Sequence, residues 1–288
     1  MLGKTRQTPK ILMRKIDTGA GPARGVLQKP APPGKFQHFR ISPPAEISLW
    51  VAHCWMVRWE LEGDAAHVAE TLPHPNFHLV YEEGKWTVSG VYTGKFSRVL
   101  KGSSSAFGVK FTPGGIRGFL KEPASAFADK TVPAEEIFGT CIGELVLPSV
   151  SAEERTASAC AFLFSLGPCA GPTIAQAGQV VASILKNPAM KTVDDVCEHT
   201  GLGKRTLQRL FQEYVGVGPK WVIRRYRLHE LMERCRSGEK LDFAQEAVDL
   251  GYFDQAHLIN DFRALVGYSP AQYQQIACGI TAGSEPPV

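Results

Sequence analysis

The chain has 288 residues, of which 44% are hydrophobic and 21% are charged, as in folded soluble proteins and unlike disordered or fibrous ones. The longest apolar run is about half of the roughly 18 residues that span a bilayer, so we expect no transmembrane segment. Seven scattered cysteines without a C-x-x-C pair argue against a disulfide framework or zinc ribbon, and they are typical of a reducing cytoplasm.

The first 35 residues are rich in Pro, Gly, Lys and Arg. Nine basic residues in positions 1–40 are opposed by Asp17 alone. This composition predicts a disordered basic tail over residues 1–35. Nonspecific contact with DNA and a solvated tail without a role are both compatible with that charge.

Short strands are predicted from residue 36 to residue 148. Two β-rich runs at 77–81 and 86–92 flank a four-residue, Gly-containing loop at 82–85, which is a hairpin signature. A further strand at 106–111 ends at Pro113-Gly114-Gly115. Many short strands with few long helical periods favour a small barrel or sandwich.

Helical patterns follow residue 148. Ser151 with Glu153 and Glu154 behind it predicts a helix start, and residues 149–171 are interpreted as a helical connector. Apolar residues at helical spacing continue from Ile174 to Leu185, and we expect helices throughout 172–276, with a tail at 277–288. The predicted fold class is therefore α+β multidomain, a β-rich N-terminal domain followed by an all-α domain.

An internal repeat carries the functional information. Leu207, Phe211, Gly216 and Pro219 recur 51 positions later as Leu258, Phe262, Gly267 and Pro270. Upstream of the turn the offset is 50, which pairs Gly201 with Gly251 and Cys197 with Ala247. Each unit has a helix with a small residue facing its partner, a turn opened by Gly, and a second helix burying Leu and Phe. This arrangement is typical of a helix-turn-helix.

A long helix is predicted between the two units. Gly218-Pro219 begins it, Ser237-Gly238 ends it, and about 18 residues at ~1.5 Å each give a rod of roughly 27 Å. Residues 204–236 carry nine basic and three acidic residues, a local positive charge suited to phosphate. The two second helices would then reach successive major grooves, about 34 Å apart.

Residues 174–276 resemble the DNA-binding domain of the AraC/XylS family of transcription regulators. The resemblance is carried by LQRLF at 207–211, GYFDQAH at 251–257, FR at 262–263 and GYSPAQY at 267–273. Upstream, LPHPNFHLVY at 72–81 and GVKFTPGG at 108–115 resemble the N-terminal domain of one AraC-type subgroup. For that domain the resemblance implies a sensing or dimerising module.

The implied partners follow from that resemblance. They are double-stranded promoter DNA, RNA polymerase, a small-molecule effector and a second copy of the chain. No cofactor and no membrane partner are expected. We expect a cytoplasmic protein that is not an enzyme.

The second helix of the first unit is a better candidate for reading bases than the second helix of the second unit. Arg pairs bidentately with guanine and Gln with adenine, each contributing about 1–3 kcal/mol of discrimination. In the family the position of Arg209 commonly contacts DNA. The candidate residues are Lys204, Arg205, Thr206, Gln208 and Arg209.

The second unit is a poorer base reader. Its candidates are Gln255, His257, Asn260 and Arg263, and Asn260 stands where the family usually has Arg. This unit is expected mainly to position the domain on the DNA backbone.

Phosphate contacts are expected from Ser269, which precedes Pro270 at a helix start, and from Arg224. Arg225 and Arg227 are further candidates on the long helix. Since residues two apart diverge on a helix, one of these two is expected to be structural.

Several histidines and one cysteine of the β-rich region leave an enzyme as the alternative. His74 and His78, if both lie on one strand, are ~13 Å apart and cannot share a metal. A cupin-like enzyme needs two His and a carboxylate close together, and no such spacing is visible. A cysteine-based alkyl-transfer enzyme would have to use Cys54.

Overall fold

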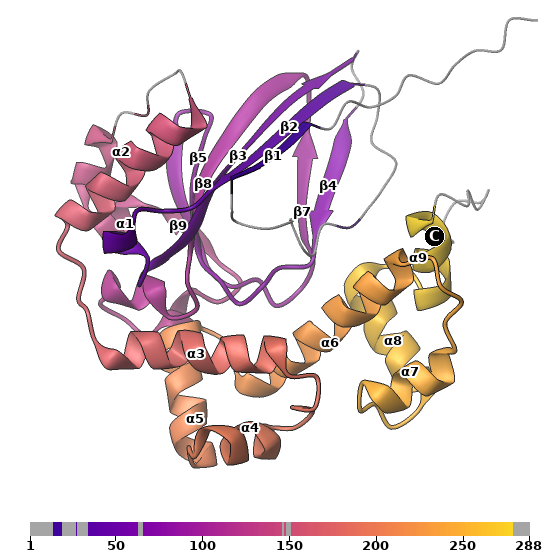
Figure 1. Ribbon diagram of the computed structural model, residues 1–288. Coiled ribbons are helices and arrows are strands. Elements are labelled where there is room, and N and C mark those ends of the chain that lie inside the picture. Colours follow the sequence, from indigo (N-terminus) through magenta and orange to yellow (C-terminus); the bar gives the residue numbers. More distant parts are fainter. Residues whose placement is uncertain are drawn as a thin grey trace, which may run out of the picture.

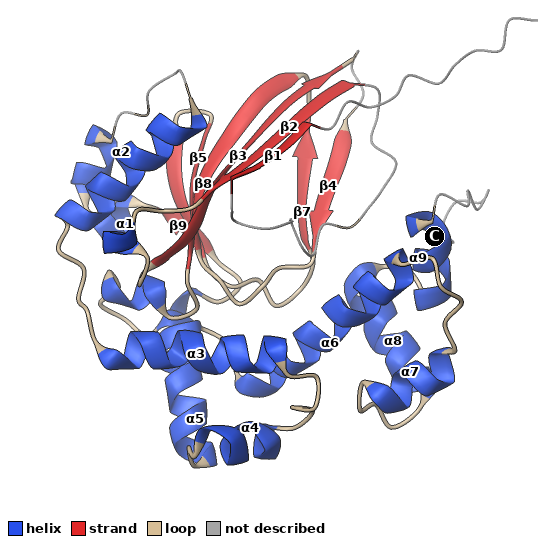
Figure 2. Ribbon diagram, in the orientation of Figure 1, coloured by secondary structure: helices blue, strands red, loops and turns tan. Residues whose placement is uncertain are grey.

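The protein folds into a β-rich module followed by a run of helices, which confirms the predicted α+β class. The computed structural model describes residues 14–18, 27, 34–62, 66–145, 147 and 151–278. Figure 1 shows the sheet with α1 and α2 beside it, α3–α5 beneath it, and α6 leading away to α7–α9. Figure 2 separates the strands from the helices.

The upstream module (residues 14–18 and 34–145) is organised by a seven-stranded sheet with the order β1-β2-β3-β8-β5-β6-β9. A separate two-stranded ribbon pairs β4 with β7. The strands are β1 Arg14–Thr18, β2 Gly34–Ile41, β3 Val51–Leu61, β4 His67–Thr71, β5 His78–Glu82, β6 Lys85–Ser89, β7 Phe96–Leu100, β8 Ser103–Phe111 and β9 Thr131–Pro133. Within the described strands, β1 and β9 stand at opposite edges of the sheet, which is therefore sandwich-like and not a closed barrel.

The predicted hairpin exists, but its loop is shorter than expected. β5 and β6 pair up to Glu82 opposite Lys85, so the loop is the two residues Glu83 and Gly84. Both have positive φ, 50° and 77°, as a type I′ turn requires. The extra pair forms because this turn has the same twist as the flanking strands.

Part of the predicted disordered tail is a strand. Residues 14–18 form β1, which pairs in parallel with β2. The backbone N–H of Leu27 donates to the carbonyl of Glu70 over 3.0 Å. The other residues before Gly34, which that prediction also covers, lie outside the described residues.

The helices begin where the caps predict. Ser151 accepts a hydrogen bond from the N–H of Glu154 and starts α2, as expected from the sequence. The α-helices are α1 Glu135–Phe138, α2 Ala152–Ser165, α3 Pro172–Lys186, α4 Val193–Thr200, α5 Lys204–Leu210, α6 Pro219–Arg236, α7 Phe243–Asp249, α8 Gln255–Val266 and α9 Pro270–Ala277. Shorter helical turns are η1 Ala45–Ile47, η2 Gly115–Gly118, η3 Ala124–Phe127, η4 Thr140–Glu144 and η5 Phe211–Val215.

The first hydrophobic core joins the upstream module to the first helix-turn-helix unit. It runs without interruption from sheet residues such as Leu79 and Val109 to Leu207 and Phe211 of the helices. The contact is close at Gly216, where φ is 97° and a Cβ would lie 3.3 Å from Cε2 of Phe77. The module and the first unit are therefore one packed body.

A second core belongs to the second unit. Leu258 and Phe262 of α8 pack there with Leu231 and Met232 of α6, and Leu72 of the upstream module joins them. The linker helix α6 thus contributes to both cores, because Val222, Ile223 and Tyr226 in its first half belong to the other core.

A buried carboxylate fixes α8 to α6. Asp261 accepts hydrogen bonds from Nε of Arg224 over 2.6 Å and from the hydroxyl of Tyr252 over 2.7 Å. Nη2 of Arg224 forms an ion pair with the same carboxylate. This network fixes the orientation of α8 relative to the linker helix α6. Among the described residues, no helix is both long and apolar enough to cross a membrane.

The close approach at Gly90 predicts a stability effect. A Cβ there would lie 1.9 Å from the carbonyl oxygen of Phe127, which is backbone and cannot rotate away. We expect Gly90→Ala to lower the free energy of unfolding by about 1–3 kcal/mol, measured by urea unfolding followed through tryptophan fluorescence. Gly94→Ala is the matched control, because nothing lies within 4 Å of its added Cβ. Equal midpoints for the two variants would contradict the packing described for Gly90.

The Asp261 network predicts a local effect. Asp261→Ala leaves the Tyr252 hydroxyl and the Arg224 guanidinium without their acceptor, at an expected cost of about 1–3 kcal/mol. Since the second unit has its own core, we expect hydrogen-exchange protection to fall in α8 and to stay unchanged in α3. Asp249→Ala, which removes an exposed carboxylate of α7, serves as the control. Unchanged protection in α8 would show that the network does not hold this helix.

Candidate DNA-binding surface

The first unit is a helix-turn-helix formed by α4, a tight turn and α5. Thr192 and Asp195 form a capping box at the start of α4, and Gly201 ends it in the left-handed region at φ 70°. Leu207 and Leu210 of α5 are buried. The sequence predicted that a small residue, Cys197 in the first unit and Ala247 in the second, faces the partner helix. Ala247 is fully buried, but Cys197 is only partly buried, and its neighbour Val196 is fully buried instead.

The other side of α5 is polar and open. All five predicted residues of this helix, Lys204, Arg205, Thr206, Gln208 and Arg209, are exposed. Nζ of Lys204 lies 2.7 Å from the Asp194 carboxylate, and this hydrogen bond, together with the charge of Asp194, raises the pKa of Lys204. Lys204 is therefore anchored within the unit, while Arg205, Gln208 and Arg209 extend from the helix.

The end of the first recognition helix is held by the upstream module. After Leu210 the helix continues as the wider turn η5 to Val215. The Arg117 side chain, from η2 of the upstream module, reaches the Glu213 carboxylate, with Nε at 2.8 Å and Nη2 at 2.6 Å. A change in the module at this point would therefore act directly on the helix that carries Arg209.

The second unit presents a smaller set of polar side chains. Gln255, His257, Asn260 and Arg263 of α8 are all exposed, as predicted for a DNA-facing helix. Asp254 caps α8 by accepting from the N–H of His257 over 2.7 Å. Because Asp261 is buried, it does not add negative charge to this exposed face.

Phe253 is a feature that the sequence analysis did not single out. Its side chain is 92% exposed in the turn just before α8. Its position between Tyr252 and Asp254, in a polar turn, is the sequence feature that could have indicated an exposed aromatic ring. An exposed ring beside a recognition helix can stack on a base or a sugar.

The linker arginines separate into different roles. Arg224 is 51% exposed despite its pairing with Asp261, so it keeps surface that a phosphate can approach. Arg225 is buried: it stacks 4.5 Å from the ring of Trp221 and its Nη2 donates to the carbonyl of Thr93. Arg227 is partly buried and donates to the carbonyl of Lys191. The sequence predicted that one of Arg225 and Arg227 is structural. In the structure both donate hydrogen bonds to backbone carbonyls.

Two polar positions at the second unit have local structural partners. Glu246 of α7 is buried, and its carboxylate lies 2.8 Å from Nη1 of Arg234. Ser269 is half-buried and forms a capping box with Gln272, in which its N–H donates over 2.9 Å and its Oγ accepts over 3.3 Å. The hydroxyl of Ser269 is thus engaged in starting α9.

The histidines of the upstream module face different neighbours. His78 begins β5 and accepts from Nε1 of Trp55 over 3.2 Å, whereas His74 lies in the preceding loop and stacks on His229 of α6. The two are not on one strand, contrary to the geometry assumed from the sequence, because the chain turns between them. No group of three potential ligands capable of holding a metal occurs within the described part of the chain.

Two family models match separate stretches of the chain. Residues 39–133 match a family described as a domain of unknown function, DUF6597, and residues 196–276 match a family described as a helix-turn-helix domain. The second match runs from within α4 to within α9 and contains α5, the linker helix α6, α7 and α8 in full. No curated protein matches the chain.

Two solved structures of ToxT from Vibrio cholerae are among the structural matches. The structure from strain O395 has 10% identity and a TM-score of 0.40, and covers 85% of this chain and 98% of its own. The unsaturated fatty acid-bound structure from strain SCE256 has 9% identity and a TM-score of 0.41, and covers 88% and 100%. Scores of this size are too low to transfer a ligand or a mechanism.

The match at residues 196–276 contains LQRLF, GYFDQAH and GYSPAQY, and these fall on α5, on the turn into α8 and on the turn into α9. The chain therefore carries a helix-turn-helix domain over residues 196–276, and its motifs there resemble those of the AraC/XylS family of transcription regulators.

Proposed function

We propose that this protein binds promoter DNA sequence-specifically, with α5 as the principal base-reading helix. The observation that carries the proposal is the exposure of Arg205, Gln208 and Arg209 on a helix whose opposite side is buried. Arg offers two parallel donors to guanine O6 and N7, and Gln offers a donor and an acceptor to adenine.

The second unit serves mainly as a positioning element. Its exposed side chains include one permanent cation, Arg263, and the short polar Asn260 where the family usually has Arg. Arg224 on the linker and the start of α9 after Ser269 are the proposed backbone contacts. Contacts of this kind set register and orientation but read no sequence.

The linker sets the distance between the two recognition helices. α6 has 18 residues, which corresponds to about 27 Å of helix. With the depth of each unit added, α5 and α8 approach the ~34 Å spacing of successive major grooves.

Control by the upstream module is part of the same proposal. The module touches the DNA-binding domain at Glu213, through Arg117, and at Trp221 and Arg225, through the carbonyl of Thr93. Either contact can transmit an effector-dependent change to a recognition helix. RNA polymerase and a second copy of the chain are the further partners that we propose.

The proposal predicts a specific effect of Arg209→Ala. Loss of a bidentate base contact should weaken binding to the specific site by about 1–3 kcal/mol and relax the sequence preference, while nonspecific binding changes less. The measurement is fluorescence anisotropy with the DNA upstream of the protein's own gene and a scrambled duplex, at two salt concentrations. Lys121→Ala, an exposed cation on the upstream module, is the control.

Two outcomes would count against the proposal. An unchanged affinity of Arg209→Ala for the specific duplex would remove α5 from the role of principal reader. Equal, salt-labile affinity of the unmodified protein for both duplexes, with every upstream segment tried, would mean nonspecific binding through phosphates alone.

A cysteine-based transfer reaction is not part of the proposal, because Cys54 is in the wrong environment. Its side chain is completely buried beside Cys160, and the contact with Cys160 together with burial raises the pKa of the Cys54 thiol well above its usual value. A reactive cysteine needs an accessible thiolate. We therefore expect iodoacetamide to label the exposed Cys169 and Cys278 in the folded protein, and Cys54 only after unfolding, as read by peptide mass spectrometry. Rapid labelling of Cys54 in the folded protein would reopen the enzyme alternative.

A further inference from the structure

A row of basic side chains crosses the seven-stranded sheet on the face that points away from α2. Lys110 of β8 is paired with His53 of β3 on one side and with His78 of β5 on the other. Paired residues point to the same face of a sheet, and successive residues point to opposite faces. Because Cys54, which follows His53, is buried in the core against α2, the three basic residues lie on the other face.

Arg40 of β2 extends this basic row to a fourth strand. Its Nη2 lies 3.1 Å from Nε2 of His53, which is itself buried. Burial, followed by the charges of Lys110 and Arg40, lowers the pKa of His53 to about 2, so this imidazole is neutral. Arg40 and His53 are thus engaged with each other.

Lys110 is the cation of the row that has no partner. Its side chain is partly buried, and among the described residues its ammonium group makes no hydrogen bond and no ion pair. Burial, aided by the charge of Arg40, lowers the pKa of Lys110 to about 8, and no described carboxylate opposes this shift. The ammonium form still predominates at neutral pH, and Nζ keeps accessible surface. An anion that reaches Nζ would offset the cost of burying this charge.

His78 supplies a second donor beside Lys110. Its Nδ1 accepts from Nε1 of Trp55 over 3.2 Å, which leaves the ring proton on Nε2. Burial, followed by the charge of Lys110, lowers the pKa of His78 to about 3, so the ring is neutral. Nε2 has no hydrogen-bond partner among the described residues and keeps accessible surface. Since paired residues have Cβ atoms about 5 Å apart, Nζ and Nε2 can reach the two oxygens of one carboxylate.

Trp55 provides a flat apolar surface next to these two donors. Its ring lies across Gly108, where a Cβ would be 2.2 Å from Cε2 of the indole. The ring is partly exposed, and it packs at the edge of the apolar cluster that contains Trp59 and Leu100. A partly exposed indole beside a cation and a neutral donor suits the apolar part of an organic anion.

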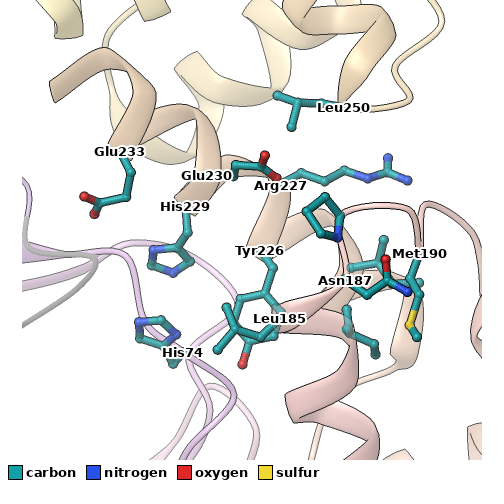
Figure 3. Close-up of a pocket in the computed structure, with 13 residues that line it drawn as sticks. His74, Leu185, Asn187, Met190, Tyr226, Arg227, His229, Glu230, Glu233 and Leu250 are labelled. Carbon is teal, nitrogen blue, oxygen red and sulfur yellow. The ribbon is translucent and has the colours of Figure 1, made fainter. Parts of the chain in front are cut away.

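The basic row lies within electrostatic reach of the linker helix. His229 of α6 stacks on His74 of the upstream module, with centroids 4.2 Å apart and planes at 8° (Figure 3). Burial and the charge of Arg225 are the largest causes that lower the pKa of His229 to about 3, and the charge of Lys110 adds to them. An anion bound to Lys110 would therefore change the electrostatic field at α6.

We propose that Lys110 and His78 bind the carboxylate of a small organic anion whose apolar part lies on the ring of Trp55. One cation and one neutral donor match the single charge and the two oxygens of a carboxylate. That such an anion regulates DNA binding rests on the function proposed above, whereas the binding itself does not.

The test uses three compounds of similar shape and different charge: phenylacetate, phenylacetamide and phenethylammonium. Each is titrated into the full-length protein without DNA and followed by ligand-observed NMR. We expect saturable binding of phenylacetate with a dissociation constant of about 1 mM, and binding at least about tenfold weaker for the amide and the cation. Either of these two binding as tightly as phenylacetate, or no saturable binding of phenylacetate, would overturn the proposal.

Variants locate the site. Lys110→Met keeps the length of the side chain and removes its charge, so phenylacetate should bind at least about tenfold more weakly. His78→Phe removes the neutral donor and should weaken binding by about threefold or more. Lys121→Met, which removes an exposed cation of the same module, is the control and should bind as the unmodified protein does. Unchanged binding by Lys110→Met would place the carboxylate elsewhere and refute the proposal.

Thermal unfolding without ligand distinguishes a binding lysine from a structural one. Since Lys110 has no partner to lose, we expect the Tm of Lys110→Met to equal or exceed that of the unmodified protein. The measurement is differential scanning fluorimetry of both proteins. A Tm lowered by more than about 4 °C would mean that the charge of Lys110 stabilises the fold, and would overturn the proposal.

The two proposals fail separately. Absence of phenylacetate binding leaves the anisotropy result for Arg209→Ala intact. A protein that binds phenylacetate through Lys110 but binds no specific DNA would retain the carboxylate site and lose the regulatory function.

Discussion

The packing of α6 into two separate cores is the constraint on which the arrangement of this protein depends. Val222, Ile223 and Tyr226 in its first half pack with the sheet and the first unit, and Leu228, Leu231 and Met232 in its second half pack with the second unit. A helix of this length is stiff, so burial at both ends fixes the distance and the rotation between α5 and α8. The helix α6 thus links α5 and α8 through these two cores.

The polar contacts of α6 are less favourable than its apolar ones. Arg225 is 1% exposed, its Nε and Nη1 have no partner among the described residues, and burial together with the charge of Arg224 lowers its pKa to about 10. Such a cation is costly to bury, and the Thr93 and Gly94 carbonyls, the Trp221 ring and the charge of Asp129 oppose the cost. The contact between the upstream module and the linker is therefore weaker than the core around it.

Local patterns predicted much of the fold and of the candidate DNA surface. The repeat, the caps and the apolar spacing placed both units, and the exposed residues of α5 and α8 are those that the periodicity assigned to the open face. The features that the sequence did not predict depend on interaction partners elsewhere in the chain. The burial of Arg225 follows from a carbonyl 132 positions away, and Glu246 is tolerated inside because Arg234 reaches it.

The shared first core also bears on how the chain is made. Sheet residues such as Leu79 and Phe111 share one core with Ile174, Phe211 and Tyr226, which are translated long after them. During synthesis the β-rich module is complete in sequence before these helices leave the ribosome, yet one apolar side of it stays open until they do. A fragment beginning near Pro172 would carry the complementary apolar surface without its cover. Cutting the chain between its two matched regions would thus yield two fragments with exposed apolar surface, both prone to aggregate. During synthesis, chaperones would be expected to bind the β-rich module until the linker helix has been translated.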